Sequence, residues 1–93
     1  MSIDKFVGCM EDCYCAEKVI NISQEDEDGT SSVNTDMVQV YRNEEYIYFE
    51  DDRDTTLKIK IINIKSIISK ITDFCEELIL TTKIKTYTFM IMG

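Results

Sequence analysis

The apolar residues at the start of the chain recur at the spacing of one face of an α-helix: Ile3, Phe6, Val7, Met10 and Tyr14. Ser2 can cap the first turn, and Asp4 suits the positive end of the helix dipole. Residues 19–22 are rich in β-branched side chains, which favours the start of a strand over a longer helix. We therefore predict an N-terminal helix within residues 1–22.

Residues 23–35 are polar, charged and nearly free of large apolar side chains. Such a composition is typical of a loop that has no face to pack against a core. We predict an acidic mobile loop over this stretch, between the helix and the rest of the chain.

From residue 36 onward, apolar and polar residues alternate with the period of a β-strand. The predicted strands are short and include two hairpins: 37–42, 46–50, 56–61, 66–72, 77–81 and 85–91. Residues 64–71 also match a helix face, but isoleucine is a poor helix former, which favours a strand there. The pattern predicts an antiparallel β-meander over residues 36–93.

These elements predict a single α+β domain over residues 1–93, with one N-terminal helix followed by about six short antiparallel strands in a curled sheet or small half-barrel. The helix is the natural cover for the apolar face of such a sheet. The strand order over residues 37–92 resembles that of small pleckstrin-homology-like barrels. This resemblance implies a domain that binds a peptide or a lipid headgroup. In that family a C-terminal helix closes the barrel, a place that the N-terminal helix would take here.

Charge is divided unevenly along the chain. Residues 1–54 hold 15 acidic and 4 basic residues, whereas residues 55–93 hold 6 lysines and 3 acidic residues. The first part therefore has a net charge of −11 and the second +3, within a total of −8. Such an uneven distribution of charge favours binding to a charged partner, whereas an even distribution would serve only solubility.

Composition also argues against several classes of function. A sequence pI near 4.4 argues against direct binding of nucleic acid, which needs a basic surface. The chain has no histidine, no glycine-rich phosphate loop and no nucleophile with a recognisable base, so we expect neither an enzyme nor a cofactor. No apolar run is long enough to span a membrane. The first residues lack the pattern of a secretion signal. Without such a signal, the four cysteines are expected to be reduced thiols, which predicts a cytoplasmic protein.

The best candidate for a binding site is a run of acidic and tyrosine residues. Its members flank one predicted strand: Glu44, Glu45, Tyr46, Tyr48, Glu50, Asp51, Asp52 and Asp54. Tyrosine is enriched at protein interfaces, and carboxylates can take the place of phosphates in a basic groove. Isoleucine and lysine are abundant, which suggests an AT-rich genome such as that of a low-GC bacterium, its phage or a large DNA virus. We therefore predict an inhibitor that occludes a basic, nucleic-acid-binding surface of a target protein. The alternatives are a solvated acidic surface and tyrosines that pack across strands.

The lysines on the C-terminal strands offer another interpretation. They alternate outward along the predicted strands: Lys58, Lys60, Lys65, Lys70, Lys83 and Lys85. Under the pleckstrin-homology-like alternative they bind a peptide or headgroup. They can also protect strand edges, or face the acidic half of a second copy in a homo-oligomer.

The cysteines give a third alternative, a zinc-stabilised structural or oligomerisation module. The candidate ligands are Cys9, Cys13, Cys15 and Cys75. Zinc requires four tetrahedral ligands, but on a helix Cys15 points about 200° away from Cys13. Reduced structural thiols are the favoured interpretation.

Overall fold

The computed structural model describes residues 1–51, 56–73 and 75–92. A helix, α1 (Ile3–Cys15), precedes eight strands among these residues. The strands are β1 (Val19–Asp26), β2 (Gly29–Asp36), β3 (Val38–Arg42), β4 (Tyr46–Asp51), β5 (Thr56–Lys60), β6 (Ile64–Ile71), β7 (Glu76–Thr82) and β8 (Thr86–Met92). A short 3₁₀ turn, η1 (Ile61–Asn63), connects β5 to β6. The α+β prediction is confirmed, and the six predicted strands correspond to β3 through β8.

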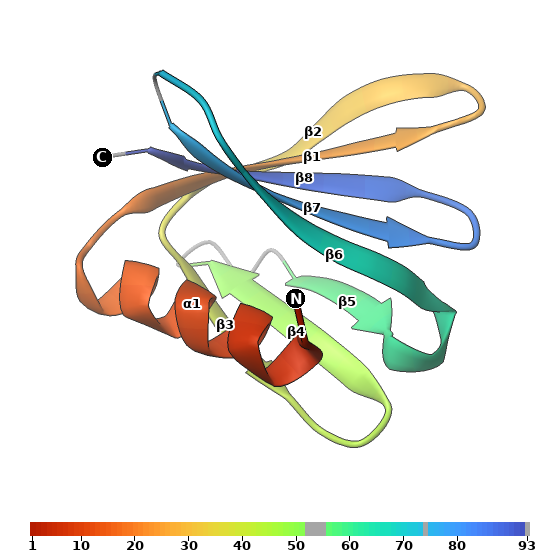
Figure 1. Ribbon diagram of the computed structural model, residues 1–93, viewed down its shortest axis with the longest axis horizontal. Helices are drawn as coiled ribbons and strands as arrows, with labels where there is room; N and C mark the ends of the chain where they lie inside the picture. The colour runs from red at the N-terminus through yellow and green to blue at the C-terminus, as the bar shows by residue number, and fades with distance from the viewer. Residues whose placement is uncertain (52–55, 74, 93) are drawn as a thin grey trace.

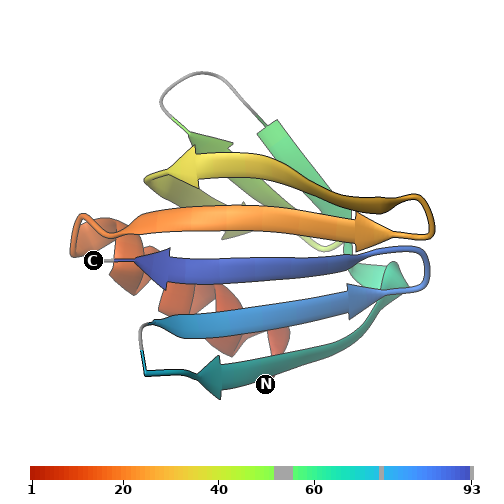
Figure 2. The same ribbon diagram turned by 90° about the horizontal axis from the view of Figure 1, so that it is seen from above.

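The strands form two antiparallel sheets that do not close into a barrel. The large sheet has five strands in the order β2-β1-β8-β7-β6, and the small sheet has three in the order β3-β4-β5. The large sheet makes one layer, and α1 lies beside the small sheet in the other (Figure 1). Seen from above, the strands of the large sheet cover the helix (Figure 2). The predicted meander is thus divided between two sheets at η1, and β8 returns to pair with β1.

The core lies between these two layers and is centred on three phenylalanines. Phe6 comes from α1, Phe49 from β4 and Phe89 from β8, and all three are fully or almost fully buried. Their ring centroids lie 5.2 Å apart for Phe49–Phe89, 5.3 Å for Phe6–Phe89 and 6.2 Å for Phe6–Phe49. The helix, the small sheet and the large sheet therefore each contribute one ring to a single aromatic cluster.

Residues 23–35 are not a loop, which corrects the sequence prediction. Strand β1 runs through residue 26 and pairs with β8 from Val19↔Met92 to Glu25↔Thr86. Strand β2 pairs with the other edge of β1, and Gly29, with φ +129°, follows the turn between them. Backbone hydrogen bonds to a distant strand order this polar segment, although it has few apolar side chains to bury.

The helix is also shorter than the predicted range of 1–22. It ends at Cys15, Ala16 caps it, and Glu17 adopts a φ of 57° before β1 begins at Val19. The β-branched residues at 19–22 belong to the strand, as their type favours. No helix in the described parts of the chain has the length and apolar character that crossing a membrane requires.

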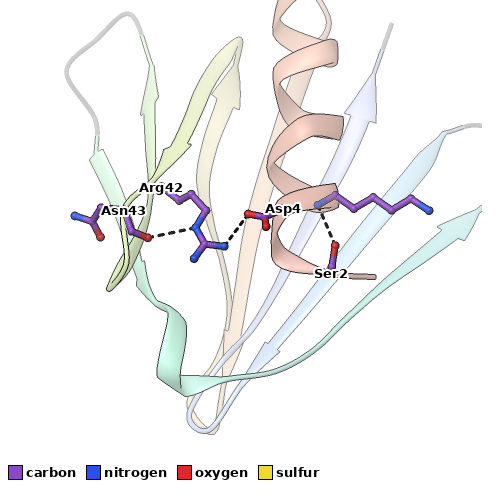
Figure 3. Close-up of polar contacts among 5 residues, drawn as sticks. Ser2, Asp4, Arg42 and Asn43 are labelled. Atoms are coloured by element: carbon purple, nitrogen blue, oxygen red, sulfur yellow. Dashed lines mark hydrogen bonds and ion pairs between the residues drawn. The ribbon is translucent and has the colours of Figure 1, made fainter.

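An ion pair joins the start of α1 to the small sheet, and a local hydrogen bond caps the helix (Figure 3). The Ser2 hydroxyl accepts a hydrogen bond from the backbone N–H of Lys5 at 3.1 Å, as the sequence predicts for a cap. Asp4 Oδ1 lies 2.8 Å from Arg42 Nη1 of β3, and Arg42 Nε donates to the Asn43 carbonyl oxygen at 3.3 Å. The helix is therefore tied to the end of β3.

Candidate functional site

The outer face of the small sheet carries a row of tyrosines, which we call the tyrosine face: Tyr41 on β3 with Tyr46 and Tyr48 on β4. Strand β4 alternates, so Ile47 and Phe49 enter the core while the tyrosines face outward. The row is thus a partly exposed aromatic surface, with Tyr41 exposed and Tyr46 and Tyr48 half-buried, on a sheet whose other side packs against the core.

Ring contacts and hydrogen bonds hold these tyrosines in place. The Tyr41 and Tyr48 rings stack with centroids 5.0 Å apart and an interplanar angle of 18°, and Tyr46 lies 5.9 Å from Tyr48. The Tyr41 hydroxyl donates to Glu50 Oε1 at 2.6 Å, and Asn43 Nδ2 donates to the Tyr48 hydroxyl at 3.1 Å. The bond to the Glu50 carboxylate raises the pKa of Tyr41. The face is therefore ordered before any partner binds, which lowers the entropic cost of binding.

Carboxylates lie at both ends of β4. Glu44 and Glu45 are exposed in the turn before it, where Asn43 Oδ1 accepts the backbone N–H groups of Glu45 and Tyr46, each at 2.8 Å. Glu50 is at the far end of the strand, beside Asp51. The structure therefore brings six of the predicted partner-binding residues into one region. Asp52 and Asp54 lie outside the described residues.

Lysines share this surface, which the charge division of the sequence did not predict. Lys58 and Lys60 of β5 lie opposite Tyr48 and Tyr46 in the strand register. The Lys58 ammonium lies 4.5 Å from the centroid of the Tyr46 ring, a cation–π contact. Lys60 also lines a surface pocket together with the two glutamates of the turn. The negative charge of the face is therefore reduced on its β5 side.

Tyr41 was missed as a candidate because it precedes the acidic run. The register of the hairpin would have identified it, because Tyr41 pairs directly with Tyr48 across β3 and β4. Two tyrosines opposite each other in a hairpin lie on the same face.

The most acidic segment of the chain lies beside basic residues. Glu25, Asp26 and Glu27 at the tip of the β1–β2 hairpin line a shallow pocket with Lys83 and Lys85 from the turn between β7 and β8. Lys85 Nζ also donates to Gln24 Oε1 on β1 at 3.4 Å. Acidic and basic residues far apart in the sequence thus lie close together at this end of the large sheet.

The cysteines do not gather into one site. Cys9 and Cys13 are neighbours on the inner side of α1, where burial raises the pKa of both thiols. Cys15 is exposed, and Cys75 lies in the connection between β6 and β7. In the described part of the chain, no group of three or more His, Cys, Asp or Glu side chains is placed to hold a metal ion.

Comparison of the chain with protein-family models, with curated proteins and with solved structures found no match. The function must therefore be argued from the geometry of the surface alone.

Proposed function

We propose that this chain is a small acidic protein-binding module that covers a basic, nucleic-acid-binding surface of a target protein. The observation that carries the proposal is the tyrosine face with carboxylates at both ends, Glu44 and Glu45 before β4 and Glu50 at its far end. Aromatic rings supply contact area, while the carboxylates supply charge complementary to a surface that binds phosphates.

The dimensions of β4 define what the target must present. Glu45 and Glu50 are five residues apart, which corresponds to roughly 17 Å along a strand. A target that engages both ends of the face needs basic groups separated by about that distance, as a groove for a nucleic-acid backbone has. Lys58 and Lys60 lie on the β5 side, so the target is expected to approach over β3 and β4.

The lysines do not support the pleckstrin-homology-like alternative equally well. Lys58 and Lys60 lie on the small sheet, Lys65 and Lys70 on β6 at the edge of the large sheet, and the remaining pair beside the acidic hairpin tip. Among the described residues they are distributed over three places and do not form a single basic pocket. We therefore base the proposed function on the tyrosine face.

The test uses two triple variants with the same change of charge. Glu44→Gln, Glu45→Gln and Glu50→Gln neutralise the tyrosine face. The matched control neutralises the hairpin tip instead, through the changes Glu25→Gln, Glu27→Gln and Asp28→Asn. The target is first captured from host lysate at low and high salt and identified by mass spectrometry, and its affinity for each variant is then measured.

We expect the face variant to lose about 1–3 kcal/mol of binding free energy, which is roughly a 5- to 150-fold loss of affinity, because exposed ion pairs each contribute up to about 1 kcal/mol. The control variant should bind as the natural chain does. The natural chain should also displace nucleic acid from the target, and its affinity should fall as salt rises. Equal affinity of the two variants, or a target that keeps its nucleic acid, would contradict the proposal.

A further inference from the structure

A surface pocket of about 340 Å³ lies where the last turns of α1 meet β3. Its lining consists of Glu11, Tyr14, Cys15, Gln39, Val40 and Tyr41. The three helix residues share one face because they are spaced i, i+3 and i+4. The volume is at the lower end of the range for sites that bind a small ligand.

The pocket is continuous with the tyrosine face through Tyr41. One side of the Tyr41 ring stacks on Tyr48 of β4, the neighbouring strand. Strand β3 is at the edge of the small sheet, and α1 packs along it, so the pocket opens on the side of Tyr41 away from Tyr48. Tyr41 is 44% exposed, and its hydroxyl is held by Glu50 at 2.6 Å. Its free surface is therefore both accessible and fixed.

The charge of the lining indicates what binds there. Glu11 is exposed and is the charged member of the lining, which contains two tyrosine rings and no lysine or arginine. The pockets at the β3–β4 turn and at the hairpin tip also have acidic linings, but they contain Lys60 and Lys83, respectively. The α1–β3 pocket thus offers a carboxylate and aromatic rings without a cation of its own.

The row of rings already binds one cation at its opposite end. Lys58 lies 4.5 Å from the centroid of Tyr46, at the β5 side of the tyrosine face. At the α1 side, the corresponding position beside Tyr41 is the pocket with Glu11. A planar guanidinium would extend the parallel stack of Tyr41 and Tyr48, and the two oxygens of one carboxylate can accept its paired N–H groups.

We infer that the α1–β3 pocket is an anchor site for an arginine side chain, held by Glu11 and stacked on Tyr41. The assignment of this arginine to the target protein rests on the proposed function, but the recognition of a guanidinium group does not. Tyr14 closes the helix side of the site and covers the aliphatic part of the arginine.

The test uses N-acetyl-arginine amide as the probe and N-acetyl-citrulline amide as a neutral isostere, at equal ionic strength. Backbone amide shifts are followed by ¹H–¹⁵N NMR during titration of the full chain. We expect the arginine probe to shift residues 11–15 and 39–41 in a saturable manner, and the citrulline probe to bind at least about fivefold more weakly. Glu11→Gln should weaken the arginine probe by about fivefold, whereas Glu25→Gln, which neutralises an exposed carboxylate elsewhere, should not.

Several outcomes would overturn this inference. Equal shifts with both probes would show that the charge is not recognised, and shifts centred on β5 or the hairpin tip would place the cation elsewhere. An absence of saturable shifts, or a Glu11→Gln variant that binds as the natural chain does, would also refute it. The proposed function is tested separately by the triple variant at Glu44, Glu45 and Glu50, so either idea can fail while the other holds.

Discussion

Phe89 lies where the two layers of the fold meet, so its removal tests whether they share one core. Its ring is fully buried, with centroids 5.3 Å from Phe6 of α1 and 5.2 Å from Phe49 of β4. We expect Phe89→Ala to lower the free energy of unfolding by about 3–5 kcal/mol. We expect the upper part of this range because two aromatic pairs are lost together. Each pair contributes about 0.5–1.5 kcal/mol in addition to the free energy gained by burying its area.

Such a loss is large for a chain of this length. At about 0.05–0.15 kcal/mol per residue, the whole domain has a free energy of unfolding of roughly 5–14 kcal/mol. At about 4–8 °C per kcal/mol, the melting temperature should fall by about 12 °C or more. Urea unfolding followed by circular dichroism measures the loss directly, provided that the slope with denaturant is unchanged.

The control for this experiment is Ile68→Ala. The Ile68 side chain on β6 is 54% exposed, so its truncation should change the free energy of unfolding by no more than about 0.5 kcal/mol. A loss below about 1.5 kcal/mol for Phe89→Ala, or a loss equal to that of the control, would refute a core shared by α1, β4 and β8.

Three further predictions concern the turn, the thiols and pH. Gly29→Ala should lower the free energy of unfolding by about 1–3 kcal/mol, because the φ of +129° at this position strains any residue other than glycine. Gly8→Ala should instead raise it by about 0.5–1 kcal/mol, because Gly8 lies in α1 and an added Cβ meets nothing within 4 Å. Thermal melts of both variants measure these changes. Iodoacetamide should modify the exposed Cys15 before Cys9, because burial raises the pKa of the Cys9 thiol. A metal chelator should leave the melting temperature unchanged. Faster modification of Cys9, or a lower melting temperature with the chelator, would contradict this prediction. Burial raises the pKa of Tyr87, so the stability that its neutral form contributes should be complete below about pH 10 and lost as the pH rises further. In melts above this pH, Tyr87→Phe should lose less stability than the natural chain does.

Local periodicity was sufficient to predict most of the elements. The helical spacing around Phe6 and the alternation from residue 36 onward both arise from burial of one face, and this information is contained in neighbouring residues. The β1–β2 hairpin has no comparable local signal beyond Ile20 and Ile22. Its order depends on pairing with β8, some seventy residues away in the register Val19↔Met92, and composition alone does not reveal such a partner.

The candidate site was predictable to the same extent. Tyr46, Tyr48 and Glu50 share a face because alternate residues of one strand do so, and the acidic turn follows from the hairpin. Tyr41 required the register of β3 against β4, and the pocket at Glu11 required the packing of α1 along β3. Contacts between elements, unlike faces within an element, are set by tertiary structure.

The charge division of the sequence has a different meaning once the chain is folded. Because β1 pairs with β8, the hairpin tip that begins at Glu25 lies beside Lys83 and Lys85, so the acidic and basic parts of the sequence are not separated at this end of the fold. Lys58 and Lys60 likewise accompany the tyrosines of β4. Under the proposed function, attraction of a basic target depends less on where acids are most numerous than on where a carboxylate has no cation beside it. The α1–β3 pocket meets this condition, whereas the pockets at the β3–β4 turn and the hairpin tip contain lysines. Glu11 and the end of the tyrosine row at Tyr41 are therefore the expected point of contact, on the side of the small sheet away from its lysines.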